Sequence, residues 1–257
     1  MLTFKKGLYE TMDNIKDMCL EVENMVVMSN DLVKAKSNLS LNEIKILRLA
    51  IMQVIKQDTE LMTYKVNIVD LADLLQIDRH DIYREMDKIT TSLLQEIVYV
   101  GDGNPKHKWL KFQWCSYCKY DNGVLTIKLH DNLKPYLIGL SQLYTQYALE
   151  DIFGLKSVYS IRLYELLREG LRGKKVYADH VAQVTILVDT IKKATDTETK
   201  YPRMGNFKAR VIDDSLKEIN EKLGYYITYT PVKESRKIIG FKFELKSEVW
   251  ARMLGEI

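Results

Sequence analysis

One pair of residues in this sequence has the spacing of a metal site. Cys115 and Cys118 form a C-x-x-C motif, which is half of a structural zinc site. A second pair is missing, and His107 and His130 are only loosely placed to complete four ligands. Residues three apart in a regular strand also point to opposite faces. We therefore expect two ordinary strand cysteines and no bound metal.

Signatures of catalysis on nucleotides or on DNA are missing from the sequence. The stretch 170–175 (Gly-Leu-Arg-Gly-Lys-Lys) has neither the spacing nor the hydroxyl of a phosphate-binding loop, so it predicts a helix end followed by a basic loop. A tyrosine that nicks DNA needs a metal to polarise the phosphate, and a His-x-His pair would hold it. The four histidines are isolated: His80, His107, His130 and His180. We expect no catalytic residue, no cofactor and no enzymatic activity.

The basic side chains offer the remaining chemistry, and they are unevenly distributed. Residues 1–150 hold 18 Lys/Arg and 20 Asp/Glu, a net charge of −2, whereas residues 151–257 hold 20 and 15, a net charge of +5. A polyanion should therefore bind the second half more strongly. Chance asymmetry is the alternative explanation of the charges alone.

Composition predicts a folded protein of one or two domains. Hydrophobic residues make up 46% of the 257 residues and charged residues 28%, and one domain takes about 150 residues. No run approaches the roughly 18 apolar residues that span a bilayer. The first 23 residues lack the apolar core of a signal peptide, and three cysteines do not make a disulfide framework. These features predict a cytoplasmic protein without membrane contact.

The first half predicts a helix-turn-helix. Ser40 and Glu43 have the spacing of a capping box that begins an amphipathic helix. A short strand at 64–66 and a brief helix at 71–75, capped by Asn67 or Asp70, follow. A third helix is expected over 79–95, with one apolar face and one polar face. The apolar face consists of Ile82, Met86, Ile89 and Leu93.

Alternating strands follow this third helix. They cover 97–100, 109–120 and 124–129, and Asn122-Gly123 is a strong hairpin turn signal. The loop 101–108 is basic at its tip. A β-hairpin after a helix-turn-helix predicts a wing. The stretch 133–154 is expected to be helical and to link the two halves.

The second half repeats this plan without residue-by-residue identity. An amphipathic helix is expected over 157–167, a strand over 184–188 and a short helix over 190–194. Gly205 or Asn206 begins a long helix that ends near Gly224, a residue suited to the left-handed conformation after a helix. A hairpin over 225–245 with the basic tip 233–237 predicts a second wing. The fold class is α+β, with two tandem winged-helix domains.

The basic residues on these helices and hairpin tips are the candidates for DNA contact, because phosphate binding needs cations along a surface and base readout needs a helix in the major groove. A solvated helix face is the alternative for each set. The second set is the stronger candidate, because it lies in the basic half. In the first half the candidates are Arg79, His80, Tyr83, Arg84, Lys88, Lys106 and Lys108. In the second half they are Arg203, Asn206, Lys208, Arg210, Lys217, Lys233, Arg236 and Lys237.

Three stretches resemble a known family. Residues 39–47 and 160–167 resemble the opening helices of the two units of iteron-binding plasmid replication initiators, tandem winged-helix proteins of theta replication. Residues 201–212, continuing to 216–220, resemble the entry to the second recognition helix of that family. Ala209-Arg210 replaces a more uniformly basic pair. The resemblance covers roughly residues 25–247.

The resemblance implies a function. Such a protein binds iterons in double-stranded plasmid origin DNA, promotes origin opening and recruits host initiator and helicase-loading proteins. A dimer formed through the first domain binds an inverted repeat and represses its own gene. The expected organisation is an N-terminal extension (1–25), winged-helix domain 1 (26–132), a helical linker (133–156) and winged-helix domain 2 (157–257). The alternatives are a winged-helix transcription regulator without a replication role and a DNA-nicking or joining enzyme.

Overall fold

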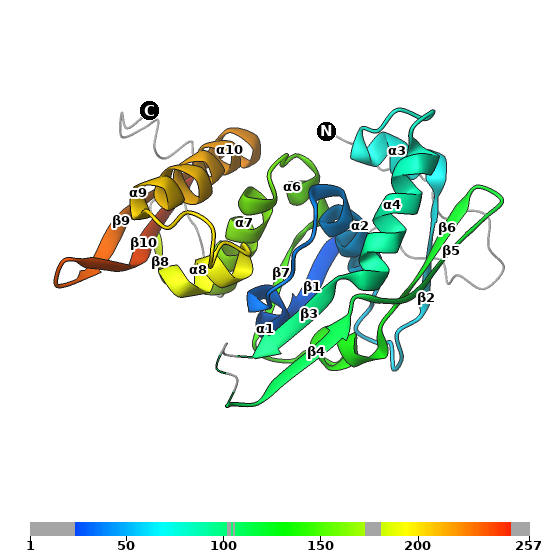
Figure 1. Cartoon of the computed structure of the whole chain (residues 1–257), viewed down its shortest axis with the longest axis horizontal. Coiled ribbons are helices and arrows are strands. Elements are labelled where there is room, and N and C mark those ends of the chain that lie inside the picture. Colours follow the sequence, from blue (N-terminus) through cyan, green and yellow to red (C-terminus); the bar gives the residue numbers. More distant parts are fainter. Residues whose placement is uncertain (1–23, 102–103, 105, 173–180, 248–257) are drawn as a thin grey trace.

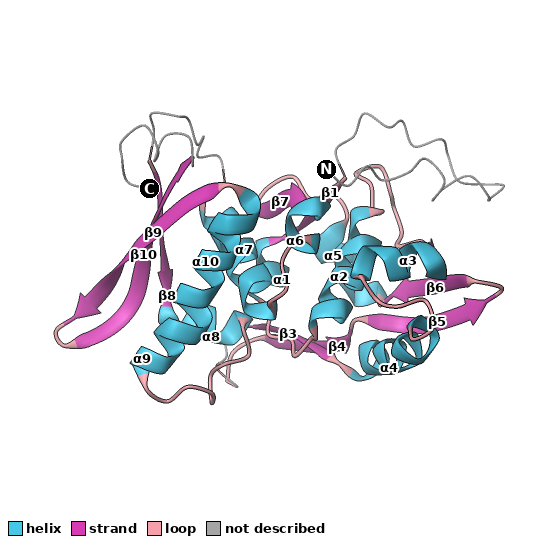
Figure 2. Cartoon of the chain, turned by 90° about the horizontal axis from the view of Figure 1, so that it is seen from above, coloured by secondary structure: helices cyan, strands magenta, loops and turns pink. Residues whose placement is uncertain are grey.

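The computed structural model describes residues 24–101, 104, 106–172 and 181–247. These residues form two winged helices with a central group of short elements between them (Figures 1 and 2). The hairpins of the two winged helices project at opposite ends of the molecule (Figure 1). Within the described residues, no helix is both long and apolar enough to span a bilayer. The expected N-terminal extension up to residue 23 and the basic loop at 173–175 lie outside these residues.

The first winged helix begins with the predicted capping box. The Ser40 hydroxyl accepts a hydrogen bond from the backbone N–H of Glu43, and the Glu43 carboxylate accepts one from the N–H of Ser40. Asn67 caps the second helix, and Gln76 ends it in the left-handed conformation with φ 57°. The elements are α2 (Leu41–Met52), β2 (Thr63–Asn67), α3 (Ile68–Leu75), α4 (Ile82–Gln95), β5 (Cys115–Asp121) and β6 (Val124–Leu129).

The apolar face predicted for α4 is confirmed, since all four of its residues are buried. The helix begins at Ile82 rather than at Arg79. Residues 78–81 form a turn instead, in which the N–H groups of Asp81 and Ile82 both donate to the carbonyl of Asp78.

The stretch expected to form the first wing divides into two hairpins. β3 (Ile97–Gly101) pairs with β4 (Trp109–Gln113) in a sheet of their own, whereas β5 and β6 join β2 in the order β2-β6-β5. The second winged helix has the matching order β8-β10-β9, so β5–β6 is the first wing. The prediction that the loop 101–108 is its tip is wrong. Lys106 and Lys108 lie at the end of the β3–β4 hairpin instead.

A bulge in β5 changes the expected placement of the two cysteines. The register with β6 shifts between Cys115 and Tyr117. As a result Cys115 lies opposite Leu129 and Cys118 opposite Ile127, two buried residues on one face of β6. The expectation that these cysteines point to opposite faces is therefore wrong. In the part of the chain that the structure describes, no three His, Cys, Asp or Glu side chains are grouped so that they could hold a metal ion.

The stretch 133–154, expected to be helical, contains a strand. β7 (Tyr144–Ala148) pairs antiparallel with β1 (Met25–Ser29). The helical prediction is wrong here because the pairing partner lies far away in the sequence, and local periodicity carries no information about it. The other central elements are α1 (Asn30–Lys34), η2 (Asp131–Leu133), α5 (Lys134–Leu137) and α6 (Leu149–Phe153).

The second winged helix follows the predicted order closely. Ser157 caps its first helix, and Gly224 ends its longest helix in the left-handed conformation with φ 66°. That longest helix is continuous through α9, η3 and α10, and η3 is a π-helical stretch within it. The elements are α7 (Val158–Gly170), β8 (Ala182–Leu187), α8 (Val188–Ala194), α9 (Met204–Phe207), η3 (Lys208–Asp213), α10 (Asp214–Leu223), β9 (Tyr225–Glu234) and β10 (Lys237–Ser247).

A buried ionic cluster joins the two winged helices. Glu165 in α7 accepts hydrogen bonds from Arg48 of α2 (Nε to Oε1, 2.7 Å) and from Tyr147 of β7 (Oη to Oε1, 2.6 Å), and it pairs with Arg162. All four side chains are buried. Burial raises the pKa of Glu165, but the charges of Arg48 and Arg162 outweigh burial and hold this pKa at about 2. Charge-assisted hydrogen bonds in the core therefore hold α2 against α7.

Candidate DNA-binding surface

The second recognition helix (α9, η3 and α10) buries its apolar side and exposes its polar side. The apolar residues Phe207, Val211, Ile212, Leu216 and Ile219 are buried, whereas Leu223, which the sequence periodicity places on the same face, is half-buried. The turn after α8 leads directly into this helix. Its exposed side chains include Asn206, Lys208, Arg210, Asp213, Asp214, Lys217 and Glu221, and Arg203 precedes its first turn.

The cations near the start of this helix have few acidic neighbours. Within the described residues, Arg203 and Lys208 have no carboxylate at ion-pair distance, and Arg210 Nη1 lies 3.6 Å from Asp214 Oδ2. Both side chains of the Arg210–Asp214 pair are exposed, so the pair contributes little. The positive end of the helix dipole lies at the same end of the helix. This end is therefore suited to phosphate binding.

The second wing packs against this helix and fixes its orientation. Tyr229 of β9 donates a hydrogen bond to Asp213 (Oη to Oδ1, 2.5 Å), and Lys208 Nζ lies 5.7 Å from the centre of the Tyr229 ring. The ring packs in turn on Phe241 and Phe243 of β10. Burial and the bond to Asp213 raise the pKa of Tyr229, so the hydroxyl remains a donor. Helix and wing therefore form one surface.

The tip of the second wing is sharp and basic. Glu234 and Lys237 pair across a two-residue turn, Ser235-Arg236, in which Ser235 has φ 53°. Lys233, Arg236 and Lys237 are exposed at this tip. No ion pair involves these three side chains within the described part of the chain. A hairpin tip with three cations is suited to contact with a phosphate backbone.

The first recognition helix (α4) and the turn before it differ, because each basic candidate on them has an acidic partner. Arg79 Nη2 lies 2.9 Å from Asp73 Oδ2, and Arg84 Nη2 lies 2.8 Å from Asp81 Oδ1. Lys88 Nζ lies 2.8 Å from Glu85 Oε1. Sequence reasoning missed these acids, although two pairs have the i,i+3 spacing that brings side chains together on a helix. The net positive charge of this helix face is therefore small.

The remaining candidates of the first half are exposed at three places: on α4, in the turn before it and on the β3–β4 hairpin. Tyr83 packs edge-on against Tyr120 of the first wing, with ring centres 5.8 Å apart, so α4 and β5 also form one surface. His80 is exposed in the turn before α4. Lys106 and Lys108 are exposed but belong to the β3–β4 hairpin. Sequence reasoning also missed Tyr120, whose position becomes apparent only when β5 is placed beside α4.

Two adjacent family models match the chain. "Initiator Replication protein, WH1" matches residues 25–168, and "Initiator Rep protein, WH2" matches residues 187–245. Together they cover most of both winged helices. The chain belongs to the initiator replication protein family.

Proteins from Escherichia coli resemble this initiator-family chain at low identity. A "Replication initiation protein" is 27% identical over 204 residues, which cover 77% of this chain and 62% of that protein. The "PI protein" is 27% identical over 209 residues, covering 70% of this chain and 68% of the relative. The chain thus spans less than two thirds of the length of the first of these relatives.

Two solved structures share the fold. The Pi initiator protein, solved in complex with iteron DNA, superposes with a TM-score of 0.70 at 24% identity, covering 88% of this chain and 98% of that one. Domains 2 and 3 of RctB superpose with a TM-score of 0.50 at 10% identity, covering 82% and 83%. At these identities the likeness establishes two tandem winged helices for this initiator-family chain.

Proposed function

We propose that this chain starts the replication of a plasmid by binding repeated sites, the iterons, in double-stranded origin DNA. Membership of the initiator family across both winged helices carries this proposal. The exposed cations of the second recognition helix and wing tip supply the phosphate contacts that it requires. The protein acts by binding, without catalysis of its own.

The two winged helices bind different parts of one repeat and contribute unequally to the affinity. The second winged helix is the main reader, because Arg203, Lys208 and the wing tip have no acidic partners within the described residues. The first winged helix contacts the adjoining part more weakly, because its cations are compensated by acids. Binding of several copies opens an A·T-rich stretch and recruits host initiator and helicase-loading proteins.

Fluorescence anisotropy over a salt series tests this proposal. The ligands are tandem direct repeats from the DNA that flanks the gene and scrambled DNA of equal length. Preference for the repeats by about a thousandfold, with a steep salt dependence, is the expected result for a specific origin binder. Equal affinity for both DNAs would overturn the proposal.

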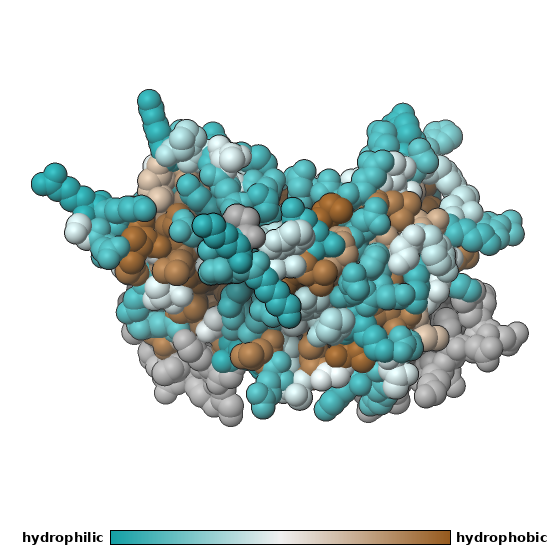
Figure 3. Space-filling model, turned by 60° about the horizontal axis from the view of Figure 1, so that its bottom comes forward, coloured by the Kyte–Doolittle hydropathy of each residue, from teal (hydrophilic) through white to brown (hydrophobic). Residues whose placement is uncertain are grey.

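The β3–β4 hairpin supports a dimer formed through the first winged helix, which would bind an inverted repeat and repress its own gene. In the described residues β4 has a strand partner on one side only, and an open edge can pair with another chain. Ile97, Trp109 and Leu110 are each about 40–50% exposed on this hairpin. The side of the molecule that carries the hairpin has hydrophobic side chains between hydrophilic ones (Figure 3).

Leu110→Glu is expected to lower the dimer fraction, because it places a charge in the proposed interface. Sedimentation velocity over a concentration series measures this fraction. Leu187→Glu is the matched control, since Leu187 is an exposed leucine of the second winged helix. Equal dimer fractions for Leu110→Glu and the wild type would place the dimer interface elsewhere.

Glu85→Gln is expected to strengthen binding of duplex DNA. Glu85 pairs with Lys88 and lies 3.9 Å from Arg84 Nε, so its removal leaves two cations less compensated beside the DNA. The slope of log K against log salt should steepen by up to about one, the contribution of one phosphate contact. Glu60→Gln, which removes an exposed partner of Lys134, is the control. An unchanged slope for Glu85→Gln would show that this face of α4 lies away from DNA.

A further inference from the structure

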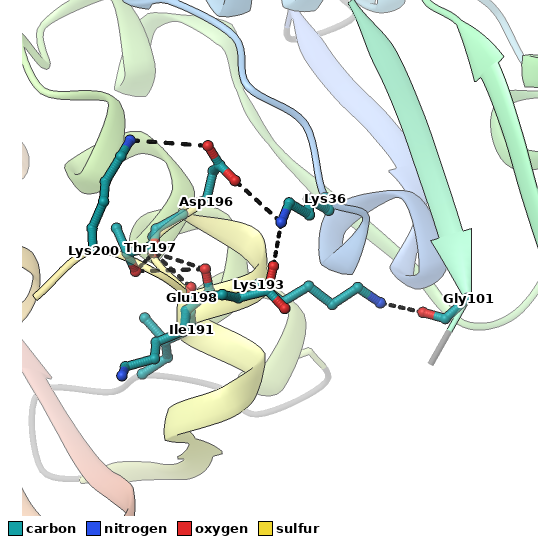
Figure 4. A network of polar contacts seen from close by, with 10 residues as sticks. Lys36, Gly101, Ile191, Lys193, Asp196, Thr197, Glu198 and Lys200 are labelled. Carbon is teal, nitrogen blue, oxygen red and sulfur yellow. Dashed lines mark hydrogen bonds and ion pairs between the residues drawn. The ribbon is translucent and has the colours of Figure 1, made fainter. Parts of the chain in front are cut away.

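A partly exposed ion cluster connects the turn between α8 and α9 to the first half of the chain (Figure 4). Lys36, which follows α1, pairs with Glu198 and lies 3.3 Å from Asp196 (Nζ to Oδ1). The hydrogen bond to Glu198 is the main reason that the pKa of Lys36 is raised, so the lysine stays charged. One cation from the first half thus holds two carboxylates of the turn.

The turn itself is held internally. The Thr197 N–H donates to the carbonyl of Lys192 (2.8 Å), and the hydroxyls of Thr195 and Thr197 lie 2.8 Å apart. Both threonines are buried. A displacement of Asp196 and Glu198 is therefore transmitted to α8 and to the second recognition helix that follows.

A buried arginine links the same two segments beneath the ion cluster. Arg162 donates to the carbonyl of Ala194 (2.9 Å) at the end of α8. Its Nη2 donates to the carbonyls of both Val33 (2.7 Å) and Ala35 (2.9 Å) at the end of α1. The ends of α1 and α8 are thus held side by side, with Lys36 outside and Arg162 inside.

The β3 strand extends this contact into the first winged helix. The backbone groups of Lys36 and Tyr99 exchange two hydrogen bonds, of 3.1 and 3.2 Å. Lys193 of α8 donates to the carbonyl of Gly101 at the end of β3 (Figure 4). Its Nζ also lies 5.6 Å from the centre of the Tyr99 ring. Since β3 follows α4 directly, a short path leads from the first recognition helix to the turn before the second.

We propose that Lys36, Asp196 and Glu198 are positioning residues that fix the separation and rotation of the two recognition helices. The chain would thereby discriminate the spacing between the two parts of its repeat. This inference rests on the proposed function, in which both winged helices bind one repeat.

The helical geometry of DNA makes the spacing between the two parts of the repeat a sensitive test of how rigidly the two winged helices are joined. One inserted base pair moves the second part of a site by about 3.4 Å and rotates it by about 35°. Two rigidly joined modules cannot follow this displacement and lose the gain from simultaneous binding, whereas loosely joined modules keep part of it.

The experiment compares Kd for the native repeat with Kd for repeats that carry one inserted base pair at successive central positions. The affinity of the wild type should fall by about tenfold or more when the inserted base pair lies between the two parts of the repeat. Lys36→Glu places a third carboxylate beside Asp196 and Glu198 and should reduce this loss by about threefold or more, in keeping with the effect of a surface ion pair and its reversal. The double variant Lys36→Glu/Glu198→Lys restores the pair and should restore spacing discrimination.

The control variant and the alternative outcomes separate this inference from the proposed function. Lys134→Glu reverses an exposed pair with Glu60 inside the first winged helix and should discriminate spacing like the wild type. Lys36→Ala removes the pair without new repulsion and replaces Lys36→Glu if that variant unfolds at lower temperature. Equal spacing discrimination in wild type and Lys36 variants would overturn the inference, as would an equal loss of affinity for all spacings. No preference of the wild type for the repeat would instead overturn the proposed function.

Discussion

Replacement of Arg203, Lys208 and Arg210 together by alanine is expected to weaken binding to the repeat by about a hundredfold or more. One arginine that reads a base contributes about 1–3 kcal/mol, and each phosphate contact adds to the salt-dependent part of the affinity. These three cations lie at the start of the second recognition helix, and among the described residues only Arg210 has a carboxylate, that of Asp214, at ion-pair distance. Anisotropy titrations at several salt concentrations measure both the loss and the change in salt slope.

The corresponding variant of the first recognition helix provides a control with the same change in charge. Arg79, Arg84 and Lys88 each have an acidic partner within 3 Å. Cations that are compensated by acids release fewer counterions from DNA. Joint replacement of these three residues by alanine should therefore lower the affinity for DNA by less than about tenfold. Equal losses of affinity for the two triple variants would contradict the proposal that the second winged helix contributes more to DNA binding than the first.

Glu165→Ala is expected to lower the free energy of unfolding by about 3–5 kcal/mol, the usual cost of leaving buried charges without their partner. The change leaves Arg48 and Arg162 facing each other in the core, and Tyr147 loses the acceptor of its hydroxyl. Urea unfolding followed by circular dichroism measures the loss. Glu169→Ala, further along α7, removes a carboxylate from a partly exposed pair with Lys34 and should cost about 1 kcal/mol or less.

The same cluster predicts a dependence of stability on pH. The folded pKa of Glu165, about 2, lies below the value of about 4.3 for an unfolded glutamate. A depressed carboxyl pKa stabilises the folded state above pH 4.3, and this stabilisation is lost as the pH falls toward 2. Glu165→Gln should therefore show a smaller fall in stability between pH 5 and pH 3 than the wild type, by about 1 kcal/mol or more. Parallel curves for the two proteins would mean that Glu165 does not titrate as this environment requires.

Features that depend on residues close together in the sequence were predicted correctly. The capping box at Ser40, the buried face of α4 and the left-handed Gly224 each depend on residues within a few turns of one another. The order of elements in the second winged helix was predictable for the same reason. The candidates on its recognition helix and wing tip are all exposed in the structure.

Features that depend on distant residues were not predictable. Periodicity within β7 says nothing about its partner β1, and the bulge that turns Cys115 and Cys118 to one face arises only from pairing with β6. The pairing of Arg48 with Glu165 joins residues 117 positions apart. Arg79 meets Asp73 across a turn rather than along a helix, so the helical spacing rule does not apply to it.

The π-helical stretch η3 bears on how the second recognition helix responds to the insertion or deletion of one codon. A π-helical turn holds roughly one residue more than an α-helical turn, because its hydrogen bonds run from residue i to i+5 instead of i+4. Such a stretch can arise when one residue is inserted into a helix whose two ends are both anchored. Here Phe207 is anchored in the core before η3, and Leu216 and Ile219 after it. Loss of one codon within 208–213 would therefore remove the extra residue and restore a regular α-helix, with Arg203 and Lys217 keeping their orientation relative to each other.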